Sequence, residues 1–260
     1  MTTSQTTIAK AEASGIGRVG QRSLAGYLVM PAILLTVLVV LFVAVASSDL
    51  SSGEQSRLNV RSVTGNLWEH LALTFVSTAL VLVIAIPAGI LLTRPFARAI
   101  TPPAITVFNI GQAVPSIGLI VLIALVFDIG FWPVVFALVT YTVLPVLRNT
   151  MVGLRQVDAS VIESARGMGM TKATVLLRIE LPLAVPIIMA GLRTALTINV
   201  GTATLGAFVG AGSLGELIVA GIVQNRQLIL VVGAVLVAVL ALLVDYVAGI
   251  AEEKLRPRGL

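Results

Sequence analysis

Residues 71–93 read LALTFVSTALVLVIAIPAGILLT and contain no charged side chain. An α-helix rises about 1.5 Å per residue, so roughly 20 apolar residues cross the ~30 Å hydrocarbon layer of a membrane. In lipid the backbone must satisfy its own hydrogen bonds, which a helix does within one segment. We therefore predict that this stretch is a transmembrane helix.

Five further apolar runs accompany this one, at 26–46, 103–127, 131–147, 186–209 and 227–244. Hydrophobic residues make up 57% of the chain and charged residues 11%, and the mean hydropathy is +1.04. A soluble domain carries about 25% charged residues. The sequence predicts an all-α integral membrane protein of about six transmembrane helices, surrounded by membrane lipid.

The remaining composition excludes several other kinds of site. A net charge of +5 would suit nucleic acid, but the basic residues lie between apolar runs, so no nucleic-acid partner is expected. The chain has no cysteine and one histidine, His70, so neither a metal nor a cofactor is expected. Because His70 lies beside Trp68 at the edge of a span, we expect it at the membrane interface.

The basic residues also predict the orientation, because Lys and Arg are enriched on the cytoplasmic side. With both termini cytoplasmic, thirteen Lys and Arg residues lie inside and only Arg57, Arg61 and Arg226 lie outside. This arrangement requires an even number of spans, as six provides. Arg193 lies within a span, where we expect it to reach the inner surface or to pair within the bundle.

The two ends of the chain are polar. Residues 1–25 and 251–260 are predicted cytoplasmic tails. The run 26–46 exceeds the 7–15 apolar residues of a typical signal peptide, so we predict a retained helix. The segment 45–48, Val-Ala-Ser-Ser, loosely resembles a cleavage site, which makes removal of this helix the alternative.

Two stretches interrupt the spans. Residues 112–116, Gln-Ala-Val-Pro-Ser, place a polar group and a proline inside the third run, where proline removes a helical hydrogen bond. Residues 201–215 are rich in small side chains, which permit close helix packing or a bent turn. Both stretches fit either packing or a polar pathway. The candidate pathway residues are Asn109, Gln112, Pro115, Ser116, Thr202 and Thr204.

Residues 148–185 form the one long, charged interruption between spans. Asp158 is suited to cap a helix that Gly167 and Gly169 then end, and Thr171 is suited to cap a second helix. Pro182 and Pro186 follow at the start of the fifth span. The sequence predicts a short helix–turn–helix at the inner membrane surface.

This loop contains a spaced pattern: Glu163-Ser164-Ala165, three residues, Gly169, nine residues, Ile179, one residue, Leu181-Pro182. It resembles the Glu-Ala-Ala loop of bacterial ATP-binding-cassette importer permeases, with Ser164 replacing an alanine. In that family the loop docks on a separate ATPase. The resemblance implies that Glu163, Ser164, Ala165 and Gly169 make the coupling contact and that Leu181 and Pro182 anchor it.

The resemblance covers roughly residues 65–250, a type I importer core of five helices like that of the methionine permeases, preceded by one extra helix. It implies a cytoplasmic ATP-binding subunit, a second permease subunit (identical or paralogous) and an extracytoplasmic solute-binding protein. Three segments, 112–116, 144–150 and 201–215, resemble the osmoprotectant branch, which imports glycine betaine, choline or carnitine. A methionine or other amino-acid permease is the alternative substrate class.

Other functions have less support from the residues. None of Lys10, Lys172 and Lys254 follows a glycine, so the chain has no P-loop and ATP hydrolysis is expected in a partner. Ser213 in its glycine-rich turn would need a base within hydrogen-bond reach to act as a nucleophile, and the one histidine, His70, is expected at the outer edge of the second span, so a protease has little support. An ion-coupled carrier would need ionisable groups in mid-membrane, where this chain offers Arg193.

Overall fold

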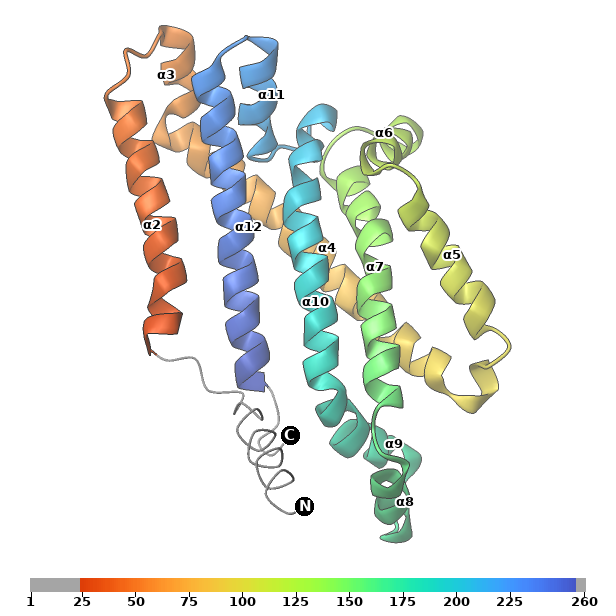
Figure 1. Cartoon of the computed structure of the whole chain (residues 1–260). Coiled ribbons are helices and arrows are strands. Elements are labelled where there is room, and N and C mark those ends of the chain that lie inside the picture. The colour runs from red at the N-terminus through yellow and green to blue at the C-terminus, as the bar shows by residue number, and fades with distance from the viewer. Residues whose placement is uncertain (1–23, 256–260) are drawn as a thin grey trace, which may run out of the picture.

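The structure is a computed structural model that describes residues 24–255. Residues 1–23 of the predicted N-terminal tail and 256–260 of the predicted C-terminal tail lie outside this range, whereas 251–255 continue the last helix. Every regular element in the described part is helical (Figure 1). Five helices are long and apolar enough to cross a membrane, and the count is six when the bent pair Thr101–Ala113 and Ser116–Phe127 is taken as one span. The prediction of an all-α protein with about six spans is therefore confirmed.

The elements follow one another in this order: α2 (Leu24–Ala46), α3 (Ser52–Leu58), α4 (Val60–Thr93), a 3₁₀ turn (Pro95–Ala97), α5 (Thr101–Ala113), α6 (Ser116–Phe127), α7 (Phe131–Arg155), α8 (Ala159–Gly167), α9 (Lys172–Val175), a π-helical turn (Leu176–Glu180), α10 (Leu181–Ala203), a 3₁₀ segment (Thr204–Val209), α11 (Gly215–Val223) and α12 (Gln227–Leu255).

The third predicted span, 103–127, is two helices. The chain bends by 94° between α5 and α6, at Val114–Pro115. Pro115 cannot donate a backbone hydrogen bond, so α5 ends and a new helix begins at Ser116. This bend lays α6 across the end of the bundle that also carries α3 and α11 (Figure 1).

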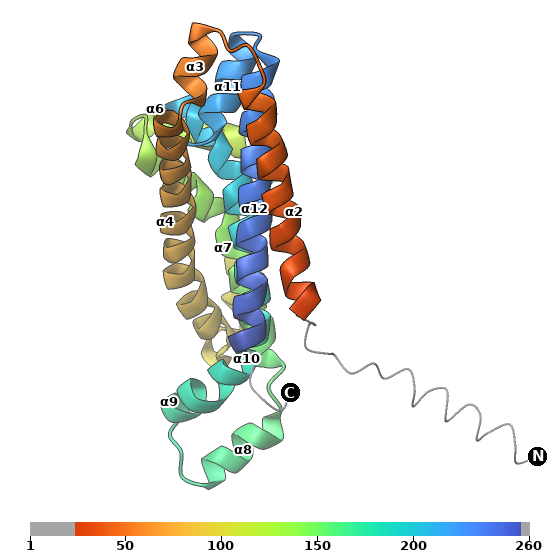
Figure 2. The same ribbon diagram turned by 90° about the vertical axis from the view of Figure 1, so that its left-hand side faces the viewer.

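Helices α4, α7 and α10 form the centre of the bundle, and α12 packs on α10 and α11. Leu73, Val81, Leu138, Leu147 and Val200 are completely buried there. Helix α5 lies against α7, and α2 lies on the outside against α12, as two perpendicular views agree (Figures 1 and 2).

Polar side chains are also buried between the central helices. Asn199 of α10 donates from Nδ2 to Thr78 Oγ1 of α4 at 2.9 Å, and Thr142 Oγ1 of α7 donates to Asn199 Oδ1 at 3.2 Å. None of these side chains is more than 4% exposed. In a low-dielectric core such satisfied polar contacts hold three helices in one register.

The expectation that His70 lies at the membrane interface is wrong. Helix α4 begins well before the predicted span, at Val60, because Asn59 caps it by accepting from Ser62 N at 2.8 Å. His70 consequently lies inside the bundle, fully buried, with Nε2 2.9 Å from the Val200 carbonyl oxygen. Its neighbour Trp68 is 73% exposed.

Arg193 pairs within the bundle, which is one of the two outcomes expected for it. Its Nη2 donates to Asp245 Oδ2 of α12 at 2.6 Å, and its Nη1 lies 3.8 Å from Glu252 Oε2. Pairing with two carboxylates compensates the guanidinium charge near the end of the span. Arg193 is therefore a structural cation and not the free ionisable group that an ion-coupled carrier would need.

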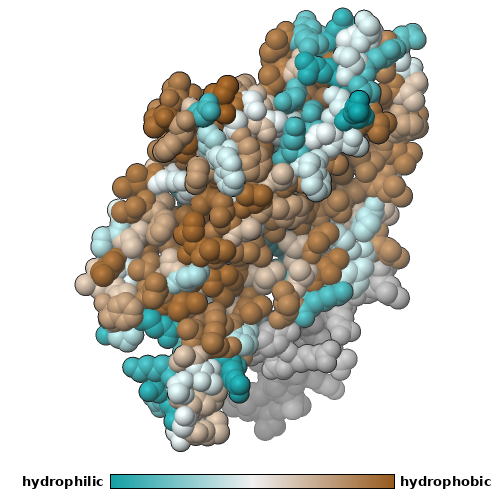
Figure 3. Space-filling model, turned by 180° about the vertical axis from the view of Figure 1, so that it is seen from behind, coloured by the Kyte–Doolittle hydropathy of each residue, from teal (hydrophilic) through white to brown (hydrophobic). Residues whose placement is uncertain are grey.

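The bundle has two distinct ends. The start of α2 and the end of α12 lie at the end that carries α8 and α9, called here the loop end, and α3, α6 and α11 lie at the opposite, α3 end (Figures 1 and 2). Between the ends the visible surface is mainly hydrophobic, and hydrophilic residues gather towards the ends (Figure 3). This pattern is that of a bundle whose middle faces lipid.

Candidate functional site

The loop between α7 and α10 folds into the helix–turn–helix that the sequence predicts, with its first helix beginning at a side-chain cap. Asp158 Oδ1 accepts from Ser160 N at 2.8 Å, directly before α8. The hydrogen bonds from the Ser160 backbone and side chain hold the pKa of Asp158 below its ordinary value of 3.8. The Asp158 carboxylate is therefore charged at neutral pH, and its negative charge interacts favourably with the positive N-terminal end of the α8 dipole.

Helix α8 ends at Gly167, and a Schellman motif with Gly169 as its left-handed residue closes it. Gly169 has φ +84°, its N–H donates to the Arg166 carbonyl at 3.0 Å, and Met170 N donates to the Ala165 carbonyl at 3.2 Å. Space for a Cβ atom is open at Gly169. The glycine is thus required by the left-handed backbone, which an L side chain resists, and not by crowding.

The second half of the motif leads into α10. Thr171 caps α9 by accepting from Thr174 N at 3.2 Å. The chain then makes one π turn, and Leu181 N–H donates to the Leu176 carbonyl five residues back. Pro182, at the second position of α10, follows at once; it lacks the N–H that would continue the ladder.

The motif residues divide between an exposed tip and a buried base. Glu163, Ser164 and Gly169 are exposed, whereas Ala165 is 1% exposed where α8 contacts α9. Met168, which the sequence reasoning missed, is 77% exposed in the turn itself. The sequence feature that could have indicated Met168 is an apolar residue placed between Gly167 and Gly169, in a turn expected to be exposed to water. Together these residues form a compact knob below the bundle (Figure 2).

An ion pair that the sequence did not predict joins this knob to α4. Arg94 Nη2 lies 2.6 Å from Glu180 Oε2, and Arg94 Nη1 donates to Glu180 Oε1 at 3.4 Å. Glu180 is 7% exposed and directly precedes the Leu181-Pro182 of the motif. The pair therefore ties the end of one span to the base of the loop.

The predicted pathway residues lie in two places. Gln112 Nε2 donates to the Tyr141 carbonyl at 2.6 Å, and Asn109 Oδ1 accepts from Arg148 Nη2 at 2.8 Å, so both join α5 to α7. The other four are found near the 94° bend and its neighbours. Pro115 and Ser116 stand at the bend that begins α6, and Thr202 and Thr204 lie where α10 passes into the 3₁₀ segment, which α6 contacts.

The small residues at 201–215 serve close packing in at least one place. A Cβ atom on Gly215 would lie 2.0 Å from the Thr204 carbonyl oxygen. Only glycine allows these two backbones to approach so closely. Within the described residues no group of three or more His, Asp or Glu side chains could hold a metal ion.

The fold and the site define a class of protein: a helical membrane bundle whose longest polar loop is an exposed, capped helix–turn–helix at one end. More particularly, the chain belongs to the family of binding-protein-dependent transport system inner membrane components, which residues 85–257 match. The resemblance of the spaced motif to the importer permeases is therefore confirmed. The protein is a multi-pass inner-membrane permease.

Relatives of known role resemble most of the chain. It is 40% identical over 193 residues to the choline transport system permease protein OpuBB of Bacillus subtilis, covering 74% of this chain and 88% of the relative. It is 42% identical over 188 residues to the osmoprotectant import permease protein OsmY of Salmonella typhimurium, covering 72% and 80%. The carnitine transport permease protein OpuCD of Listeria monocytogenes is 39% identical over 196 residues, covering 75% and 87%.

Solved structures support the same fold. The inward-facing MetNI methionine ABC transporter matches with a TM-score of 0.69 at 25% identity, covering 80% of this chain and 100% of that chain. An amino acid ABC transporter matches with a TM-score of 0.61 at 20% identity, covering 74% and 93%. The type I importer fold expected from the motif is therefore confirmed.

Proposed function

We propose that this chain is the permease of an ATP-driven importer for a compatible solute with a quaternary ammonium group, of the glycine betaine, choline or carnitine kind. The observation that carries the proposal is the exposed knob formed by the spaced motif, in a chain whose relatives near 40% identity are named for these solutes. Translocation proceeds by alternating access, driven from outside this subunit.

The knob couples the permease to a cytoplasmic ATP-binding subunit. Glu163, Ser164 and Gly169 meet the partner with Met168, and Ala165 supports them from below. Ile179, Leu181 and Pro182 join the knob to α10, and the Arg94–Glu180 pair joins it to α4. A movement of the knob caused by closure of the ATPase pair would thus be transmitted to α4 and α10 together.

Orientation and further partners follow from the same proposal. The loop end faces the cytoplasm with both chain termini, which the excess of Lys and Arg at this end supports. An ATPase dimer offers two grooves, so a second permease subunit, identical or paralogous, completes the pore. Helix α2 is an addition before the five-helix core. The pathway is lined by Asn109, Gln112, Pro115, Ser116, Thr202 and Thr204.

Catalysis and solute selection reside in other subunits. The chain has no P-loop lysine, so ATP is hydrolysed by the partner. Aromatic residues make up only 5% of the chain, and a quaternary ammonium is usually held in an aromatic cage. An extracytoplasmic binding protein therefore supplies the affinity.

A methionine or related amino-acid importer is the second candidate, because the solved structure with the TM-score of 0.69 is a methionine transporter. The relatives named for choline and osmoprotectants, at 40% and 42% identity against 25%, favour the quaternary ammonium solute.

Uptake measurements test the proposal. The chain would be expressed with the ATPase and the binding protein that the proposal expects as its partners, in cells without their own osmoprotectant importers. We expect radiolabelled glycine betaine, choline or carnitine to accumulate, and accumulation to stop when the ATPase is deleted. Uptake of methionine alone would favour the second candidate, and uptake that persists without the ATPase would exclude both.

A further inference from the structure

Helix α2 is only thinly attached to the rest of the bundle. Among the side chains of α2 that the structure describes, Leu34 alone is buried. At the loop end, Tyr246 Oη of α12 donates to the Tyr27 carbonyl oxygen at 2.5 Å. At the α3 end, the segment that leads from Ala46 into α3 leaves a hollow beside the start of α12.

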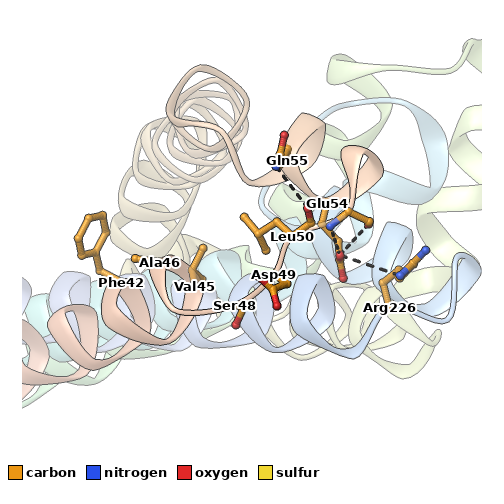
Figure 4. Close-up of a pocket in the computed structure, with 10 residues that line it drawn as sticks. Phe42, Val45, Ala46, Ser48, Asp49, Leu50, Glu54, Gln55 and Arg226 are labelled. Carbon is orange, nitrogen blue, oxygen red and sulfur yellow. Dashed lines mark hydrogen bonds and ion pairs between the residues drawn. The ribbon is translucent and has the colours of Figure 1, made fainter.

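This hollow is a polar cavity of about 520 Å³ between the end of α2, α3 and the turn before α12 (Figure 4). Asp49, Glu54 and Arg226 line it. Glu54 accepts from Ser51 N at 2.9 Å and from Ser51 Oγ at 2.7 Å, and these bonds hold the Glu54 pKa below its ordinary value. Two carboxylates and one guanidinium therefore face one small space.

Arg226 is not committed to Glu54. Its Nη1 is 4.0 Å from Glu54 Oε2, beyond hydrogen-bond distance, and half of its side chain is exposed. A guanidinium has five N–H donors in a planar fork suited to carboxylate or phosphate. Arg226 therefore has donors available for an acceptor that enters the cavity.

An apolar groove of about 340 Å³ continues from the polar cavity. The two share Phe42 and Val45, and the groove extends along α2 to Leu38 and across to Val232 and Leu236 of α12. Leu38 stands eight residues before Ala46, roughly 12 Å further into the hydrocarbon layer at 1.5 Å per residue. The hollow is thus polar at the membrane surface and apolar within the membrane.

We propose that the cavity and the groove together bind one phospholipid with a zwitterionic ethanolamine headgroup. The phosphate lies at Arg226, the ammonium lies between Asp49 and Glu54, and one acyl chain fills the groove between α2 and α12. An anionic headgroup would meet two carboxylates against one cation, and a small soluble zwitterion would leave the groove empty. The site is independent of the proposed transport function and of the orientation in the membrane.

Lipid titration of the full-length protein, followed by native mass spectrometry, tests this site. The delipidated chain would be titrated with phosphatidylethanolamine and with phosphatidylglycerol of the same acyl chains. We expect the first to bind about ten-fold more tightly, and Arg226→Ala to weaken that binding about ten-fold, as loss of one charged hydrogen bond implies. Arg57→Ala, an exposed arginine of α3 outside the cavity, is the matched control and should leave binding unchanged.

A second variant tests the groove without touching the charges. Leu38 is 37% exposed, so Leu38→Trp can fill the groove while α2 stays packed, and we expect it to weaken phosphatidylethanolamine binding at least as much. Equal affinity for the two lipids, or unchanged binding in both Arg226→Ala and Leu38→Trp, would overturn the proposal. So would displacement of the lipid by free glycine betaine, which would make the cavity a site for a soluble zwitterion.

Discussion

Arg94 and Glu180 form a two-point ion pair, with Nη2 2.6 Å from Oε2 and Nη1 3.4 Å from Oε1, across 86 residues of sequence. Arg94 caps the end of α4, and Glu180 closes the π turn that leads from the knob into α10. Paired guanidinium–carboxylate bonds fix geometry as well as energy. The knob therefore cannot shift without carrying the end of α4 or breaking this pair.

Breaking the pair should uncouple the knob from the bundle. Arg94→Ala leaves the Glu180 carboxylate, 7% exposed, without its cation, and we expect a loss of about 1–3 kcal/mol of stability. Substrate-stimulated ATP hydrolysis by the assembled transporter should fall with it. Thermal unfolding and ATPase assays measure both, and the exchanged double variant Arg94→Glu with Glu180→Arg should recover part of each. If substrate-stimulated ATP hydrolysis is unchanged in Arg94→Ala, the ion pair does not couple the knob to the bundle.

Gly169→Ala should weaken docking of the ATPase. Alanine must adopt φ +84° at this position, which costs about 1–2 kcal/mol, so the Schellman turn opens and the tip loses its shape. Gly167→Ala is the matched control, because Gly167 is also exposed with open space around it but ends α8 without a positive φ. Recovery of the ATPase in a pull-down should fall for the first variant only. Equal recovery with both would remove the role assigned to this turn.

The Asp158 cap should respond to pH in one direction. The folded pKa lies below the ordinary 3.8, so the stabilisation is present above that value and is lost as pH falls through the lower, folded pKa. Amide hydrogen exchange of α8 should therefore be constant from pH 5 to 8 and rise only in stronger acid, after correction for the intrinsic rate. Asp158→Ala should raise exchange across the whole range, whereas Asp158→Asn, which can still cap, should not. A transition near neutral pH would contradict the assignment.

Local signals made much of this fold predictable. The apolar runs specify the spans, and Asp158 and Gly169 act within a few residues of themselves, so their cap and turn chemistry is readable from the sequence. Partners distant in sequence are not. Nothing in the sequence near Glu180 indicates its pairing with Arg94, 86 residues away. The prediction that His70 is interfacial assumed a helix that begins at residue 71, whereas α4 begins at Val60. A proline indicates the break at Val114–Pro115, but the 94° angle depends on how α6 packs.

Two threonines of α4, about one turn apart, should respond differently to substitution by valine, as measured by the stability of the bundle. Thr78 Oγ1 accepts from Asn199 Nδ2 at 2.9 Å, whereas Thr74 Oγ1, completely buried, has no hydrogen-bond partner in the part of the chain that the structure describes. Valine has nearly the shape of threonine without its hydroxyl. Thr78→Val leaves the Asn199 amide unpaired and should destabilise the bundle by about 1–3 kcal/mol, while Thr74→Val removes an unpaired polar atom and should be neutral or stabilising.

Unfolding temperatures of the two purified variants in one detergent measure this difference. Thr64→Val is the surface control, because Thr64 is an exposed threonine near the start of the same helix, and we expect it to change the unfolding temperature little. The comparison separates the lost hydrogen bond from the exchange of a hydroxyl for a methyl group, since all three variants make that exchange. If Thr74→Val destabilised the bundle as much as Thr78→Val, the Thr78–Asn199 bond would have no special part in holding α4 to α10.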